Sequence, residues 1–553
     1  MSSPAADETV DYLIIGAGLA GLTMHHFLES DSKVIVDSRP ARYKLGESLI
    51  PEHFSDSGLA SLLAKARALP SYSPKCGSMF IGSDSVAAFP LSPEDYSRAL
   101  HVRREELERL MIDEWQVPIR DERVTGLDVA ARVVTTSRRT YRVRRQILDC
   151  SGPAMVVARS LGRSTELWKS WASWMYYDIV GIHEARFTDW LRDAGVRYAR
   201  YDPGLGHPLG APEYPGWRSF DCTVVAQVQP GSFAWQIPLY GRSILSFGVT
   251  SRLGPVSLDA LREAGRRCIA PHYEVRERPH DRSSEYNRFH VGNRFSHRAL
   301  DVATRDWILV GDAGFFGEPI YATGTSVAVN QALYVARALN RGGWGEAELA
   351  DYVERCGRVV AASTEARRYF FAPADDQPAE PREVFRERGI DGTPFQLTMA
   401  NNYGRVLLGL LPLSESADQG RSFGSVFESD AGEQEALTVA FARWLGAVPS
   451  WSVRAVYRAK AGLQVAFTHT TKPELTVRLA SLSPGDRAYR VVGPFGLTYR
   501  SARNGDYPLD PSTDALFAAL SRRLTTMAEP VSGWLSGALV PPESPPFDAP
   551  PEP

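Results

Sequence analysis

Residues 10–22 read VDYLIIGAGLAGL, an apolar, β-branched run that ends in glycines and continues into a helical pattern. Gly16, Gly18 and Gly21 have the spacing GxGxxG, and Asp37 ends the next apolar run, KVIVD. In a strand–turn–helix–strand unit, Gly16 makes the tight turn, Gly18 lets the backbone approach a diphosphate, and Gly21 permits close helix packing. The stretch therefore predicts a Rossmann-like dinucleotide-binding unit in which Asp37 accepts hydrogen bonds from ribose hydroxyls.

Length and composition narrow the class of protein. The chain has 553 residues, enough for two or three domains, and is 44% apolar and 23% charged. A net charge of −3 gives no electrostatic reason to expect a nucleic acid or an anionic membrane as partner. The longest apolar stretch is too short to span a bilayer and the acidic start has no signal core, so a cytoplasmic protein is expected. Five scattered cysteines without a CxxC pair predict neither a disulfide framework nor a metal site.

The composition and residue pattern of successive segments predict how the chain divides into domains. Aromatic-rich alternating segments favour an antiparallel sheet, and a later proline- and charge-rich stretch favours a linker. The expected parts are a dinucleotide-binding module over 8–370 with a substrate-binding sheet at about 165–300 inserted in it, a linker and helical crossing over 371–435, a small α+β unit over 436–530, and a proline-rich tail over 531–553.

Three further segments resemble the FAD-dependent monooxygenase superfamily. ILVGDAG (308–314) resembles its flavin-ribityl motif, RREELERL (103–110) resembles the helix whose arginine contacts the FAD phosphates, and ILDCSG (147–152) resembles its crossing strand. The resemblance implies FAD as cofactor. The residues that would bind it are Gly311 and Asp312 at the ribityl chain and Arg104, with Arg103 as the alternative, at the phosphates.

The resemblance also implies a fold class. The expectation is an α/β, Rossmann-like FAD-binding fold of the glutathione-reductase type, with an antiparallel-sheet substrate region and a C-terminal α+β extension. The sequence has no second GxGxxG for a nicotinamide cofactor. A separate flavin reductase is therefore expected to supply the reduced cofactor, FADH2.

Four segments narrow the resemblance to the flavin-dependent halogenases. GESLIP (46–51), PKCGSMF (74–80), FAWQIP (233–238) and GFFGEPIYATG (314–324) are similar to that family's motifs and occur in the same order. Residues that bind or face the flavin by this resemblance are Gly46, Glu47 and Ser48. The halide and flavin turn would hold Pro319, Thr323 and Gly324. The substrate pocket would hold Phe233, Trp235, Tyr321 and His53, and the catalytic residue would be Lys75.

The resemblance assigns chemistry to Lys75. Reduced flavin and O2 form a flavin hydroperoxide, a halide attacks it to give hypohalous acid, and a lysine ammonium holds or carries the halogen at the substrate. An ammonium group acts more strongly in a low-dielectric site than in water. The other interpretation of Lys75 is a solvated loop lysine, and the local sequence does not decide between them.

The chain departs from the family at the substrate. Tyr321 and Ala322 stand where tryptophan-accepting halogenases have glutamate and serine, which argues against free tryptophan, and Phe233 replaces the first tryptophan of the family's WxWxIP motif. Three functions stay open: halogenation of an electron-rich aromatic substrate, hydroxylation of such a substrate, or a reductase without oxygen insertion. The substrate is a small molecule or is tethered to a carrier or peptide. The C-terminal unit would cap it, bind its carrier, or stabilise a homodimer.

Overall fold

The computed structural model describes residues 5–371, except 55–56, 92–97, 202–207, 210–216, 230, 294 and 318, and also residues 392–399 and five strands between residues 451 and 501. The chain divides into two compact units. The first contains residues 1–198, 216–377 and 413–415, and the second contains residues 199–215, 378–412 and 416–553. The domain limits expected from the sequence stay predictions.

A mostly parallel sheet forms the part of the first unit that the sequence predicts to bind a dinucleotide. Its order is β2-β1-β10-β9-β8, and β21 lies beside β10. Strands β1, β2, β10 and β21 are parallel to one another, whereas β9 is antiparallel to both of its neighbours, β10 and β8. The bounds are β1 (Ala5–Ile15), β2 (Lys33–Val36), β8 (Val124–Asp128), β9 (Val133–Thr136), β10 (Arg139–Asp149) and β21 (Trp307–Leu309).

The register of this sheet brings the loops after β1, β2, β10 and β21 to one edge. Val36, Ile15, Asp149 and Leu309 are neighbours in one row across the sheet. Because the four strands are parallel, their carboxyl ends lie at the same edge, where open α/β sheets bind their ligands. The glycine-rich turn and the segments after β2, β10 and β21 therefore meet there.

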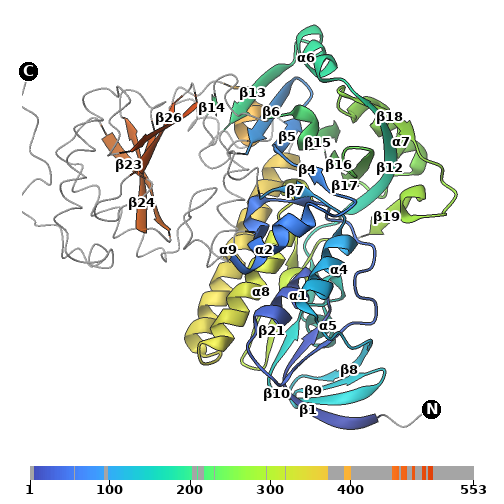
Figure 1. Ribbon diagram of the computed structural model, residues 1–553, viewed down its shortest axis with the longest axis vertical. Helices are drawn as coiled ribbons and strands as arrows, with labels where there is room; N and C mark the ends of the chain where they lie inside the picture. Colours follow the sequence, from blue (N-terminus) through green and yellow to red (C-terminus); the bar gives the residue numbers. More distant parts are fainter. Residues whose placement is uncertain are drawn as a thin grey trace, which may run out of the picture. The chain divides into compact units, whose positions relative to one another are not determined.

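Helices cover this sheet, and α1 and α8 begin at the same edge. Helix α1 packs against α8 and α4, and Figure 1 shows these helices beside the strands of the sheet. Helix α8 is buried along almost its whole length. The bounds are α1 (Leu19–Phe27), α2 (Ser57–Ala66), α4 (Arg104–Trp115), α5 (Val156–Ser160), α8 (Gly324–Asn340) and α9 (Glu346–Phe371).

A second, larger sheet follows the order β6-β5-β15-β16-β17-β12-β18, with β19 beside β12. Its neighbours are antiparallel, as expected for this region, except that β5 and β15 are parallel. Strands β5 and β6 come from before the expected range of about 165–300. The bounds are β5 (Gly77–Ile81), β6 (Ser85–Pro90), β12 (Trp171–Ile182), β15 (Cys222–Gln229), β16 (Ser232–Leu239), β17 (Ile244–Ser251), β18 (Tyr273–Glu277) and β19 (His290–Asn293).

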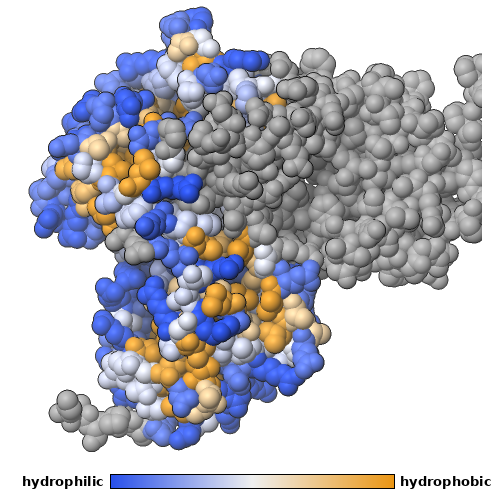
Figure 2. Space-filling model, turned by 180° about the vertical axis from the view of Figure 1, so that it is seen from behind, coloured by the Kyte–Doolittle hydropathy of each residue, from blue (hydrophilic) through white to orange (hydrophobic). Residues whose placement is uncertain are grey.

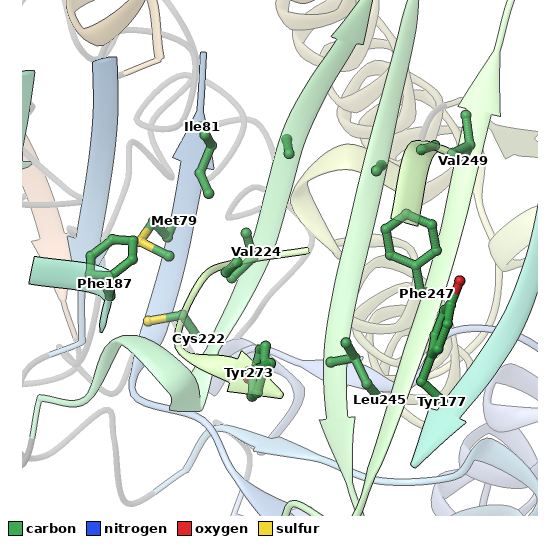
Figure 3. Packing of buried hydrophobic residues seen from close by; sticks show 14 of the residues in the cluster. Met79, Ile81, Tyr177, Phe187, Cys222, Val224, Leu245, Phe247, Val249 and Tyr273 are labelled. Carbon is green, nitrogen blue, oxygen red and sulfur yellow. The ribbon is translucent and has the colours of Figure 1, made fainter. Parts of the chain in front are cut away.

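The two faces of the larger sheet have different neighbours. Figure 3 shows Met79, Val224 and Phe247 together on one face, which helices α6 (Glu184–Asp193) and α7 (Leu258–Cys268) cover. Successive strand residues point to opposite faces. The other face therefore carries a separate cluster of Ala172, Tyr176, Trp235, Ile237 and Leu239.

Two small sheets connect these parts. The order β3-β7-β4 places Ser48 and Ser73 on either side of His101. The order β11-β20-β22 supports the segment after β21. The bounds are β3 (Ser48–Leu49), β4 (Ser73–Pro74), β7 (Leu100–His101), β11 (Ser164–Glu166), β20 (His297–Ala299) and β22 (Phe315–Phe316).

The second unit contains an antiparallel sheet whose strands pair in sequence order from β23 to β27. The expected crossing over 371–435, apart from residues 371 and 392–399, and the tail over 531–553 lie outside the described residues. The bounds of the five strands are β23 (Trp451–Ala459), β24 (Gly462–His469), β25 (Thr476–Leu479), β26 (Ala488–Gly493) and β27 (Gly496–Ser501). The short strand β14 (Pro208–Leu209) also belongs to the second unit, and β13 (Arg197–Tyr201) includes residues of both units.

The surface of the first unit is mixed in character. Figure 2 shows hydrophilic residues interspersed with separate apolar patches on the face seen from behind. Of the helices in the described ranges, none combines the length and the apolar character that crossing a bilayer requires.

Candidate active site

The glycine-rich turn after β1 is packed so closely that larger residues do not fit. Gly16 has a φ of +99°, and a Cβ there would lie 2.6 Å from the carbonyl oxygen of Cys150. A Cβ at Gly21 would lie 1.9 Å from the carbonyl oxygen of Gly16. Gly18 differs, because its backbone is extended and a Cβ would meet only Lys44 Nζ at 3.5 Å and Glu108 Oε1 at 3.8 Å. Gly16 and Gly21 therefore serve the turn itself, and Gly18 keeps the start of α1 accessible.

Asp37 stands at the end of β2 beside this turn. One carboxylate oxygen accepts a hydrogen bond from the Ala17 amide at 2.8 Å, and the other accepts one from the Arg39 amide at 2.7 Å. Each carboxylate oxygen has a second lone pair. Asp37 is thus held in place by the backbone and still has acceptor capacity for hydroxyl groups such as those of a ribose.

Two cations share one buried carboxylate next to α1. Lys44 Nζ lies 2.5 Å from Glu108 Oε2, and Arg104 donates to Glu108 Oε1 at 3.0 Å. The pair lies beside a helix N-terminus whose first turn holds no acidic residue and whose cap, Gly18, has no side chain. Two cations at a helix N-terminus fit a bound diphosphate. The sequence pattern did not indicate Lys44, which belongs to no motif and reaches the turn only through the path of its loop.

The structure distinguishes the two arginines that start α4. Arg104 packs on Gly46, whose added Cβ would lie 2.8 Å from the guanidinium. Arg103 instead lies between the rings of Tyr43 and Tyr286, at 5.0 and 4.1 Å from their centres, and is paired with Glu105. Arg104 is therefore the arginine that lies beside Gly46 and Glu108, and its contact with a cofactor phosphate stays a prediction.

Asp312 follows β21 at the same edge. Its backbone oxygen accepts a hydrogen bond from His297 Nε2 at 2.8 Å, and the Gly311 amide before it donates to Gln331 Oε1 at 2.6 Å. Burial raises the pKa of the Asp312 carboxyl to about 6, although the nearby charges of His297, Arg104 and Lys44 act in the opposite direction. These contacts hold Asp312 beside the Lys44 and Arg104 pair.

The raised pKa gives a test in the FAD-free protein. The folded protein keeps a proton on Asp312 that the unfolded chain has already lost above its ordinary pKa of 3.8, so the free energy of unfolding falls as pH rises toward 6. Relative to Asp312→Asn, we expect the wild type to lose about 2 kcal/mol between about pH 4.5 and about pH 7. Urea denaturation of both proteins measures this. A difference that is constant with pH would contradict the shift, and Asp301→Asn serves as a control at a partly exposed aspartate.

The N-terminus of α8 lies after a tight turn. Pro319 begins this turn, Ala322 has a φ of +55°, and Thr323 caps the helix without a side-chain hydrogen bond. The hydroxyl oxygens of Thr325 and Ser326 are buried and have no hydrogen-bond partner among the described residues. Buried hydroxyls without partners cost free energy, so this end of α8, which starts at Gly324, fits a polar ligand such as a flavin ring or a halide.

Lys75 is buried, with 1% of its surface exposed. Its Nζ donates to Ser48 Oγ at 2.8 Å, Ser48 Oγ lies 2.7 Å from Thr223 Oγ1, and Thr223 Oγ1 lies 3.0 Å from His101 Nε2. The interpretation of Lys75 as a solvated loop lysine is therefore wrong. Ser48 comes from the GESLIP segment, but Thr223 and His101 escaped sequence reasoning because no motif marks them.

Comparison with known proteins identifies the fold. No protein-family model and no curated protein matches the chain. A flavoprotein/dehydrogenase from Cytophaga hutchinsonii matches with a TM-score of 0.52 at 16% identity, over 72% of this chain and 93% of that chain. Flavin-dependent brominase Bmp2 matches with a TM-score of 0.50 at 17% identity, over 72% and 94%. Halogenase PltM in complex with phloroglucinol and FAD matches with a TM-score of 0.52 at 16% identity, over 72% and 86%.

The chain has the fold of these flavoproteins. The expected α/β fold class is confirmed, and at these identities the likeness concerns the fold alone. The edge at which the residues described above meet is the one where open α/β sheets bind their ligands. FAD fits the set of groups found here, which consists of the glycine-rich turn, Asp37, the Lys44 and Arg104 pair, Asp312 and the start of α8.

Aromatic side chains also gather on the face of the larger sheet that α6 and α7 do not cover. Trp235 is buried, its indole Nε1 has no hydrogen-bond partner among the described residues, and its ring lies 6.5 Å from that of Trp174. Trp174 donates to the Tyr43 hydroxyl, which lies 2.7 Å from the Tyr176 hydroxyl. Tyr176 donates to Glu47 Oε1 at 2.8 Å, and burial raises the pKa of Glu47. Glu47 thus ties the GESLIP segment to the sheet.

Three expected pocket residues remain, and the structure describes the side chains of Phe233 and Tyr321. Phe233 is buried on β16, two residues before Trp235. The Tyr321 ring lies 5.6 Å from the Phe80 ring and is buried. His53 lies in a short 3-10 helix (Pro51–Phe54), but its side chain is outside the described part of the chain. The places of all these residues in a substrate pocket stay predictions.

Gly248 makes room for Trp235. Gly248 is the cross-strand neighbour of both Trp235 and Trp174, and an added Cβ would lie 2.1 Å from Trp235 Cζ2 and 2.6 Å from Trp174 Cβ. We expect Gly248→Ala to displace the indole and lower the free energy of unfolding by about 1–3 kcal/mol. Tryptophan fluorescence and urea denaturation measure both effects. In the control Gly292→Ala, the Cβ meets Trp174 only at 3.5 Å, so an equal loss there would contradict the steric cause.

Proposed function

We propose that the protein is an FADH2- and O2-dependent enzyme that halogenates an electron-rich aromatic substrate. One observation carries the proposal: Lys75 is buried and its ammonium bonds to Ser48 of the GESLIP segment at 2.8 Å. Burying an ammonium costs free energy, even when it is hydrogen-bonded. A reaction that needs an amine away from water gives this lysine a chemical role, whereas hydroxylation or a plain reductase reaction needs none.

In this proposal, each residue of the site has a separate role in binding the cofactor, the halide or the halogen. The start of α1, Lys44 and Arg104 hold the diphosphate of FAD, Asp37 holds its adenosine ribose, and Asp312 holds its ribityl chain. When bound, reduced FAD with O2 supplies the oxidising power that converts a halide into hypohalous acid. The start of α8 offers backbone N–H groups and buried hydroxyls for the halide. Lys75 holds the halogen electrophile away from water and directs it to the ring.

Tyr321 and the aromatic residues around Trp235 on the larger sheet support a phenol as the class of substrate. Tyr321 is a neutral residue at the place where tryptophan-accepting halogenases carry glutamate, so an amino-acid substrate finds no carboxylate there. Trp235 offers an indole N–H without a partner among the described residues and a ring for stacking. The similar halogenase PltM was crystallised with phloroglucinol, a polyhydroxylated ring. A free or carrier-tethered phenol is the proposed substrate.

The test is a product analysis. The protein is incubated with FAD, a flavin reductase, a reduced nicotinamide cofactor, O2 and either bromide or chloride, together with phenolic substrates. Mass spectrometry then identifies the product. The proposal expects the isotope pattern of the halogen. A gain of oxygen alone would show a hydroxylase, and flavin reoxidation without any modified ring would show a non-oxygenating flavoprotein. Reactions without halide are the control.

A further inference from the structure

A chain of hydrogen bonds joins Lys75 to a buried histidine. It runs from Lys75 Nζ through Ser48 Oγ and Thr223 Oγ1 to His101 Nε2, with distances of 2.8, 2.7 and 3.0 Å. All four side chains are buried. The short strands β3 and β7 pair Ser48 with His101, so the chain is built into the backbone. Its members come from segments far apart in the sequence and share no motif.

We propose that His101, through Thr223 and Ser48, takes up the proton that Lys75 must lose before its amine bonds to a halogen. This inference rests on the proposed function and extends it. An ammonium has no lone pair, so only the neutral amine reacts with hypohalous acid. Lys75 is the catalytic residue, and His101, Thr223 and Ser48 act through it as positioning residues.

The direction of the chain follows from the chemistry of its members. An ammonium only donates, so Lys75 donates to Ser48. The other contact that Ser48 makes among the described residues is to Thr223, so the Ser48 hydroxyl donates there and the Thr223 hydroxyl donates to His101 Nε2. In this direction His101 Nε2 is an acceptor and the ring hydrogen is expected on Nδ1, a buried atom without a hydrogen-bond partner among the described residues. A proton that leaves Lys75 therefore finds a lone pair at the far end of the chain.

Burial and charge keep His101 neutral at rest, so its Nε2 carries a lone pair that can receive a proton. Burial, followed by the charge of Lys75, holds the pKa of His101 well below its ordinary value, so its imidazole is neutral while Lys75 is charged. Proton transfer moves one positive charge along the chain and creates no second one. The repulsion between the two groups disappears once Lys75 is neutral, whereas burial, the larger cause of the low pKa, still disfavours the charged ring, so His101 holds the proton only briefly and returns it to the amine.

The steps balance. The Lys75 ammonium gives a proton to Ser48, Ser48 gives one to Thr223, and Thr223 gives one to His101 Nε2. The neutral amine attacks the halogen of hypohalous acid, so an N–halogen bond forms, the halogen–oxygen bond breaks, and the amine proton and hydroxide leave as water. The ring then takes the halogen, loses its own proton to the amine nitrogen, and the amine recovers its ammonium proton from His101.

The first test reads the tautomer directly and needs no FAD turnover. Protein labelled with ¹⁵N-histidine is examined by NMR, and the His101 signals are assigned with His101→Gln. In the wild type we expect a neutral ring with its hydrogen on Nδ1. In Lys75→Met, which removes the ammonium donor, the chain is free to reverse, and we expect the hydrogen to move to Nε2. A hydrogen on Nε2 in the wild type would overturn the relay.

The second test separates making hypohalous acid from using it. A β-diketone trap measures hypohalous acid that escapes, while mass spectrometry measures the halogenated phenol. In His101→Gln, whose amide still bonds to Thr223 but cannot take up the proton, we expect the halogenated phenol to fall by about 10²-fold and the trapped acid to rise. Thr223→Val should behave in the same way, and Thr223→Ser should retain wild-type product.

The control is His272→Gln, since His272 is another buried histidine outside this chain. It should leave both readouts unchanged. Wild-type product formation in His101→Gln or Thr223→Val would overturn the relay. Absence of trapped acid and of product in every protein, the wild type included, would instead overturn the proposed function, and the NMR tautomer would then decide the relay alone.

Discussion

Lys75→Met lowers the formation of halogenated product by about 10²–10³-fold, a loss comparable to that of a buried electrostatic group at a reaction centre. Methionine keeps the length and apolar body of the side chain but has no amine, so it can neither hold nor carry a halogen. FAD binding should persist, because Lys75 bonds to Ser48, whereas Lys44 and Arg104 are held by Glu108. Product is quantified by mass spectrometry beside the rate of reduced-nicotinamide oxidation.

Two variants sharpen this experiment. Lys75→Arg keeps a buried cation and a donor toward Ser48, so product formation by this variant would show that charge alone is sufficient. Lys65→Met removes an exposed lysine on α2 that pairs with Glu114 and should behave as the wild type. If Lys75→Met forms product at the wild-type rate, the buried amine takes no part in the reaction and the proposed function loses its main support.

Gly21→Ala abolishes FAD binding and destabilises the dinucleotide-binding sheet by more than about 3 kcal/mol, above the usual cost of an overpacked core. The new Cβ would lie 1.9 Å from the Gly16 carbonyl oxygen and 3.0 Å from its carbon. Those atoms belong to the backbone of a turn that itself rests on Cys150, so neither side can move without opening the β1–α1 junction. Urea denaturation and FAD titration measure the two losses.

Gly18→Ala separates the turn from its ligand. An alanine Cβ there meets only side-chain atoms at 3.5 and 3.8 Å, and the φ of −85° suits any residue. We expect stability to stay within about 1 kcal/mol of the wild type, with FAD affinity falling at least about tenfold because the methyl group stands where the backbone meets the diphosphate. Unchanged FAD affinity would mean that the start of α1 does not face the cofactor.

Gly357→Ala is the matched control for both glycine variants. Gly357 lies within α9, and a Cβ there meets no atom within 4 Å. Because alanine loses less backbone freedom than glycine when a helix forms, this variant should gain about 0.5–1 kcal/mol and bind FAD as the wild type does. Destabilisation by Gly357→Ala would show that alanine substitution is harmful in general, and the comparison with Gly21 would lose its meaning.

The sequence by itself determined the dinucleotide part of the fold. The GxGxxG turn, the β-branched runs around it and Asp37 are local signals, because strand, turn and helix follow one another within a few dozen residues. Asp312 and Arg104 were found through motifs of the same kind, and the structure places both at the predicted edge. Such sites are readable because backbone geometry requires particular residues at fixed spacing.

Only the tertiary structure decided the surroundings of Lys75. The segment around it reads equally well as a solvated loop, and nothing near it marks Thr223 or His101. Parallel pairing of β5 with β15 brings Thr223 into the same polar chain, and the pairing of β3 with β7 brings His101 beside Ser48. Lys44 reaches Glu108 in the same non-local way. Burial and hydrogen bonding depend on which distant strands become neighbours, and a one-dimensional pattern holds no distances between them.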